Sequence, residues 1–305
     1  MKGLRLAIAG GLIAACLWLF DPRAVAGHLA ALELSWILAA MSALLAQTVL
    51  MALRWRLVAR CLGAEMGVAW AIREYLLGQL ANATLPGGVL GDAARAARAR
   101  DGAAGLRGAA TAVLIERAVG QVGLAAVAAG ALVTTLLLPG GFAPPGPLAA
   151  AMAAILAVLA ILLVTVARRR RFERLLRRSF PSPRMAWTQS ALSLVAALLN
   201  IAAFVAAARA TGTALDPGAA LVVTPVILAA MLVPLTVGGW GWREGAAAAL
   251  FPLAGAAPAA GVAAGIAFGT AVLLSVLPFA LLAICCRPPG QVRPILGEIA
   301  SKGAE

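Results

Sequence analysis

Long apolar runs alternate with short polar or basic loops along the whole chain. A run of about 20 apolar residues is long enough for a helix to cross a lipid bilayer. The short alternating segments of a membrane β-barrel are absent, so the pattern predicts an all-α, polytopic membrane protein. The runs predict about six full transmembrane helices, over residues 4–20, 34–53, 108–138, 148–167, 189–208 and 261–284.

The charges of the loops predict how these helices are oriented. Arginines gather in three of the loops, whereas three others are close to neutral. Cytoplasmic loops of membrane proteins hold the excess of Lys and Arg, so we expect the basic loops and both termini to be cytoplasmic. The basic loops are 54–60, 95–107 and 168–184, and the neutral loops are 21–33, 139–147 and 209–217.

Two further segments, 68–94 and 218–258, must each begin and end on one side of the membrane if the six helices alternate. We therefore predict that each is a re-entrant helical hairpin. The alternative is that 68–91 is a full span and that 218–258 forms two ordinary short helices. Glycine and proline interrupt helices, and the breaks are expected at Pro86, Gly87 and Gly88, and at Gly238, Gly239 and Gly241.

Two spans, a hairpin and a third span follow one another in this order twice along the chain. The first set starts on the inner side of the membrane and the second set starts on the outer side. The halves, 1–138 and 148–286, are therefore predicted to form an inverted repeat, as in many secondary transporters. Their breaks are similar in sequence, because LPGGVLGDAAR at 85–95 and PLTVGGWGWREG at 234–245 each combine a proline, paired glycines and later charges.

Composition supports the membrane interpretation. The chain is 63% hydrophobic and only 12% charged, whereas soluble proteins have about a quarter charged residues. The net charge of +13 comes mainly from loop arginines, which predicts contact with anionic lipid head groups and no nucleic-acid partner. The four cysteines lack the spacing of a metal site, and we expect no metal and no cofactor.

We expect one integral membrane domain over 1–305, with a cytoplasmic tail at 287–305. The apolar start resembles a signal peptide, but its apolar run continues past Cys16, so we interpret it as an uncleaved helix. The loop 168–184 is basic with apolar residues along one side; it either lies on the inner membrane surface or only anchors the topology. Those apolar residues are Phe172, Leu175, Leu176 and Phe180.

Ionisable residues inside a membrane are costly and are candidate functional residues. One arginine side chain can bind two phosphate oxygens at once. The free N–H groups where a helix is interrupted attract anions. The pattern predicts a site for an anionic lipid head group; the alternative is that these charges pair only to hold the helices together. The candidates are Asp92, Arg95, Glu116, Arg117, Arg243 and Glu244, with Gln79, Asn82, Gln121 and Asn200 as supporting polar residues.

Adjacent helical residues point in different directions, so we expect each member of Glu116–Arg117 and Arg243–Glu244 to reach a partner on another element. Arg73 and Glu74, near the start of the first hairpin, are expected at the membrane interface.

Three motifs in this order resemble the lysylphosphatidylglycerol synthase transmembrane family, and the resemblance spans essentially the whole chain. They are LPGGVLGDAARAARAR, ERAVG and PLTVGGWGWREG. The first motif commonly has two glycines before the aspartate, where this chain has Leu90–Gly91. The matching residues are Pro86, Gly87, Gly88, Gly91, Asp92 and Arg95, then Glu116, Arg117 and Gly120, then Gly238, Gly239, Gly241, Arg243 and Glu244.

The resemblance implies a protein of the bacterial inner membrane that translocates lipids or lipid-linked sugars between leaflets. The chain ends at Glu305, so we expect no aminoacyl transferase domain and no enzyme activity. No ATP-binding motif is present, so movement would be passive or coupled to an ion. Two alternatives remain: a polyprenyl-linked glycosyltransferase, or a non-catalytic partner of lipid or glycolipid biosynthesis enzymes, for example in a hopanoid pathway.

Overall fold

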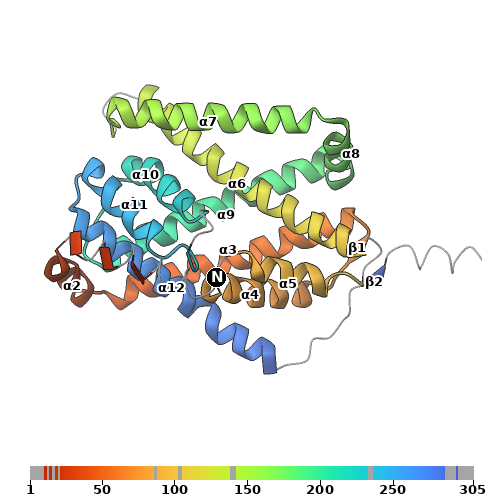
Figure 1. The fold of residues 1–305 in the computed structure, drawn as a ribbon, viewed down its shortest axis with the longest axis horizontal. Coiled ribbons are helices and arrows are strands. Elements are labelled where there is room, and N and C mark those ends of the chain that lie inside the picture. The colour runs from red at the N-terminus through yellow and green to blue at the C-terminus, as the bar shows by residue number, and fades with distance from the viewer. Residues whose placement is uncertain are drawn as a thin grey trace, which may run out of the picture.

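The computed structural model describes residues 21–85, 88–101, 105–137, 142–232 and 236–285, with the short stretches 10–11, 14–15, 18–19 and 293–294. These residues are almost entirely helical (Figure 1). The helices are α2 (Pro22–Ala30), α3 (Leu34–Cys61), α4 (Val68–Thr84), α5 (Leu90–Arg98), α6 (Gly105–Leu137), α7 (Gly146–Ala167), α8 (Arg170–Ser179), α9 (Pro183–Ala210), α10 (Pro217–Ala230), α11 (Trp242–Leu250), the 3-10 helix η1 (Phe251–Ala254) and α12 (Pro258–Cys285).

Within the described residues, four helices are long and apolar enough to cross a membrane. They are α3, α6, α9 and α12, and they confirm four of the six expected spans. The expected span 148–167 is the helix α7, whose apolar side chains are largely exposed. Most of the span expected at 4–20, most of the tail 287–305, and Pro86 and Gly87 lie outside the described residues.

The order of elements repeats along the chain. A long helix, a shorter helix, a glycine-containing break, a second short helix and another long helix occur as α3 to α6 and again as α9 to α12. The first long helices of the two sets, α3 and α9, pack against each other, and α4 contacts α12 as α10 contacts α6. Figure 1 shows α10 and α11 toward one end of the longest axis and α4 and α5 toward the other.

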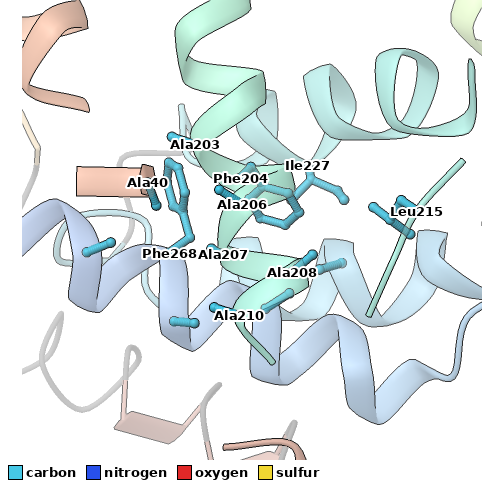
Figure 2. Packing of buried hydrophobic residues seen from close by; sticks show 14 of the residues in the cluster. Ala40, Ala203, Phe204, Ala206, Ala207, Ala208, Ala210, Leu215, Ile227 and Phe268 are labelled. Carbon is cyan, nitrogen blue, oxygen red and sulfur yellow. The ribbon is translucent and has the colours of Figure 1, made fainter. Parts of the chain in front are cut away.

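Small side chains make this close packing possible. On α9, alanines at 203, 206, 207, 208 and 210 are buried, and Phe204 packs against Phe268 of α12 with ring centroids 5.4 Å apart (Figure 2). Small residues let helix backbones approach closely in membrane proteins. The core therefore lies where α3, α9, α10 and α12 meet.

The basic loop contains the helix α8, which follows α7 directly. Its arginines are mostly exposed, whereas Leu175 and Phe180 pack against a buried cluster that includes Trp55 and Val58 of α3. These two apolar side chains therefore pack against the protein itself, and the outward surface of α8 is mainly basic. A short antiparallel pairing joins β1 (Ala64–Glu65), which follows α3, to β2 (Arg293–Pro294), which follows α12 in the chain.

Candidate functional site

The two helix breaks meet inside the molecule. A Cβ atom added to Gly238, in the second break, would lie 2.8 Å from the carbonyl oxygen of Ala83, at the end of α4. Gly238 has a φ of 55°, a left-handed conformation that glycine adopts without steric cost. Glycine is therefore required here both by backbone conformation and by the contact with the first break.

A cavity of about 720 Å³ opens beside this contact. Both breaks line it, through Gly88 and Val89 on one side and Thr236, Gly238 and Gly239 on the other. Apolar residues of α3, α6, α10 and α12 also line it. All four supporting polar residues of the sequence prediction line the cavity, and so do three of the predicted charged ones: Gln79, Asn82, Gln121, Asn200, Asp92, Arg95 and Arg117.

Asp92 and two arginines form the charged wall of the cavity. The Oδ1 atom of Asp92 lies 3.0 Å from both Nε and Nη2 of Arg95, three residues later on α5. Its Oδ2 atom lies 2.7 Å from Nη2 of Arg117 on α6. One carboxylate therefore joins two guanidinium groups from two helices.

Glu116 lies directly behind this wall and is fully buried. Its Oε2 atom accepts a hydrogen bond of 2.8 Å from Nη2 of Arg95, and its Oε1 atom accepts one of 3.3 Å from the hydroxyl of Tyr75. Arg54 approaches from α3, with Nη1 at 3.9 Å from Oε1, and donates to the Glu116 carbonyl oxygen at 3.0 Å. Glu116 and Arg117 thus each reach partners on other elements, as predicted.

Sequence reasoning missed Arg54 and Tyr75. Arg54 was assigned to a cytoplasmic loop, but α3 continues to Cys61 and places this arginine, fully buried, inside the bundle. The motif ERAVG contained a signal for Arg54 in its last residue, Gly120. A Cβ atom at Gly120 would lie 3.4 Å from Nη1 of Arg54. The glycine one helical turn after Glu116 therefore makes room for a guanidinium group.

The network has an excess of one positive charge, since Arg54, Arg95 and Arg117 face only Asp92 and Glu116. Its cavity-lining members also retain unused hydrogen-bonding capacity. Among the described residues that line the cavity, four buried polar atoms have no protein partner, and each belongs to a group that can donate. They are Nη1 of Arg95, Nε of Arg117, Nδ2 of Asn82 and Oγ1 of Thr236.

Asn82 fixes the start of α5 against α4. Its Oδ1 atom accepts a hydrogen bond of 2.7 Å from the backbone N–H of Gly91. Next to it, a Cβ on Gly91 would overlap the carbonyl group of Gly78. The two glycines let α4 and α5 approach closely enough for Asp92 and Arg95 to reach the cavity.

The structure corrects the placement of Arg243 and Glu244. They do not line the cavity, and they form an ion pair with each other rather than with separate elements. Glu244 accepts a hydrogen bond of 2.6 Å from the N–H of Gly241, and Arg243 lies 4.8 Å from the ring centroid of Trp240. The left-handed conformation of Gly241, with φ of 88°, turns the Glu244 carboxylate back onto the helix start.

Glu74 is also buried within the protein, and its expected place at the membrane interface stays a prediction. It pairs with the adjacent Arg73 at 2.6 Å and with Arg98 of α5. Arg73 also donates a hydrogen bond of 2.8 Å to the carbonyl oxygen of Ala283. This cluster joins α4, α5 and the end of α12, and it lies outside the cavity wall.

These features define a multi-pass membrane protein with a largely apolar cavity between its helix breaks, one wall of which carries the arginines and Asp92. A family model described as the lysylphosphatidylglycerol synthase TM region matches residues 4–280, so the chain belongs to this family and has a membrane lipid-related function. Comparisons with curated proteins and with solved structures gave no match.

Proposed function

We propose that this protein is a lipid translocase that moves an anionic lipid, or a lipid-linked anionic head group, between the leaflets of the bacterial inner membrane. The observation that supports this most directly is the network with excess positive charge at the cavity wall, where the Arg117 side chain is 39% exposed. A partly exposed guanidinium group binds ligands that are rich in acceptor oxygens, such as a phosphate group.

The cavity also suits a molecule that is apolar at its other end. Leu114 of α6 and Leu232, just after α10, both line the cavity and are exposed at the surface of the protein. An exposed apolar side chain on a membrane helix faces lipid tails. A head group on Arg95 and Arg117 would therefore have its acyl chains next to the bilayer, and no chemical step is needed.

Movement between leaflets requires access from both sides, and the two breaks offer it. We propose that α4–α5 and α10–α11 are re-entrant segments from opposite sides, with cytoplasmic chain termini, so that their contact at Gly238 and Ala83 marks the depth of the site. Transporters of this kind bind substrate near the bilayer midplane at interrupted helices.

Cysteine labelling tests the re-entrant arrangement. In a cysteine-free background, Glu65→Cys and Asp101→Cys should react with an impermeant maleimide from one side, and Ala214→Cys and Ala257→Cys from the opposite side. All four positions are exposed and flank the two segments. If the two positions of either pair react from different sides, that segment crosses the membrane and the proposed access route is wrong.

Replacing Arg117 with alanine tests the function. In vesicles of phosphatidylcholine with a fluorescent phosphatidylglycerol, the variant should translocate the probe about tenfold more slowly than the wild type, because a charge-assisted contact is lost. The Arg117 side chain is 39% exposed and has one ion-pair partner, so folding should survive.

Arg100→Ala is the matched control, since its side chain is 67% exposed and pairs only with the neighbouring Asp101. It removes the same charge and should leave the rate unchanged. A wild-type rate equal to that of protein-free vesicles, or equal rates for wild type and Arg117→Ala, would refute translocation through this site.

A further inference from the structure

Asp92 is the one carboxylate among the described residues that line the cavity. A cavity that binds anions would hold them more tightly without it, because a negative charge on the wall repels an anionic ligand. Its side chain makes no capping hydrogen bond to the start of α5, so its observed polar contacts are with the two arginines. Asp92 lies in the first turn of α5, where the helix dipole favours a negative charge, but that preference does not explain its contact with Arg117 on α6.

The Asp92 carboxylate contacts the two arginines with the same kind of oxygen atoms that a phosphate group presents. Its two oxygens engage two different guanidinium groups, Oδ1 with Arg95 and Oδ2 with Arg117, at 2.7 to 3.0 Å. A phosphodiester likewise presents two unesterified oxygens that arginine binds in this distance range. The aspartate and a phosphate group would thus compete for the same donors.

The two contacts of Asp92 differ in how easily they can be exchanged. Arg95 is almost fully buried and is also held by Glu116 at 2.8 Å, so it has a fixed position. Arg117 has 39% of its side chain exposed, and its Nε atom has no partner. The Asp92–Arg117 contact is therefore the one that an incoming anion can replace.

We infer that Asp92 is a built-in competitor for the head group: it neutralises Arg117 while the site is empty, yields it to a phosphate, and displaces the phosphate again on release. This inference rests on the proposed function. A carrier must bind its ligand weakly enough to release it on the far side, and an internal anion lowers affinity without removing the arginines that select the ligand. Asp92 then sets the balance between capture and release.

The test is Asp92→Asn in the full-length protein, which keeps the size of the side chain and removes its charge. Binding is measured by titrating dioctanoyl phosphatidylglycerol, with dioctanoyl phosphatidylcholine as the zwitterionic comparison. We expect about tenfold tighter binding of phosphatidylglycerol, a smaller change for phosphatidylcholine, and slower translocation in vesicles because release is delayed.

Asp101→Asn is the control for general electrostatic attraction. Its side chain is 77% exposed and pairs with Arg100, and it makes the same change in net charge outside the cavity. It should alter neither binding nor rate. Tighter binding by both variants to the same degree would overturn the inference, since the effect would then come from net charge alone.

The results separate this inference from the proposed function. Weaker or unchanged binding by Asp92→Asn, with a translocating wild type, overturns the competitor role and leaves translocation standing; Asp92 would then position Arg95 and Arg117. Tighter binding by Asp92→Asn, with a wild type that moves no lipid, supports competition at an anion site and overturns translocation.

Discussion

Replacing Glu116 with alanine is expected to lower the free energy of unfolding by about 3–5 kcal/mol, the usual cost of removing one partner from a buried ion pair. Arg54 and Arg95 are both almost fully buried and both approach this carboxylate. Without it, Arg54 would lose its carboxylate, and Arg95 would keep only Asp92, which already compensates Arg117. Two guanidinium groups would then repel each other in a water-poor interior.

Unfolding of the purified protein in detergent, followed by heat or denaturant, measures this loss. Glu65→Ala is the matched control, because the Glu65 side chain is 47% exposed and lies 3.8 Å from Arg60, and surface pairs contribute little. Replacing Arg54 and Glu116 together with leucine should recover part of the stability, since one charge of each sign is removed and Arg95 and Arg117 both keep their contact with Asp92. If Glu116→Ala is as stable as the control, the buried network is not what holds α3, α5 and α6 together.

Gly91→Ala is expected to be nearly as damaging, although it adds a single methyl group. That group would overlap the Gly78 carbonyl oxygen and lie 2.8 Å from the Asn82 side chain. Since backbone cannot move aside as a flexible side chain can, α4 and α5 must separate. Overpacking of this kind costs about 1–3 kcal/mol, occasionally more, and it should also weaken binding of phosphatidylglycerol, because α5 positions Asp92 and Arg95.

Gly130→Ala is the control, because the same substitution there is expected not to lower the stability. Gly130 lies within α6, is exposed, and a Cβ there would meet nothing within 4 Å. Alanine favours a helix by up to about 1 kcal/mol over glycine, so this variant should be equally or more stable. Thermal unfolding of Gly91→Ala and Gly130→Ala measures this difference. Similar melting temperatures for the two variants would show that the α4–α5 contact has room for a methyl group.

Asp92, Arg95, Glu116 and Arg117 are four of the six charged residues that the sequence analysis assigns to one site, and the structure joins these four through ion pairs. They could be chosen from the sequence because ionisable residues are rare in apolar helices and each needs a partner. Arg54 could not be found in this way. A count of loop charges ends a span at the first arginine, whereas the real helix continues through Arg54 with Trp55 buried beside it.

The second break misled the prediction because its motif resembles the first while its surroundings differ. Glu116 is the twelfth residue of α6, and Gly269 is the twelfth residue of α12. In the first repeat an arginine meets that glutamate; in the second, Arg243 packs on the bare glycine, with its guanidinium carbon 2.9 Å from where a Cβ would lie. Arg243 therefore pairs with the adjacent carboxylate of Glu244. The second break lines the cavity through residues such as Gly238 and Gly239 instead.

The single excess positive charge of the network has an electrical consequence. A membrane potential of 100 mV does about 2.3 kcal/mol of work on each elementary charge that crosses it. A head group with one negative charge, bound to Arg95 and Arg117, would bring the local sum of charges to zero. The loaded site would then be insensitive to the potential, whereas the empty site, with one unbalanced charge, would respond to it.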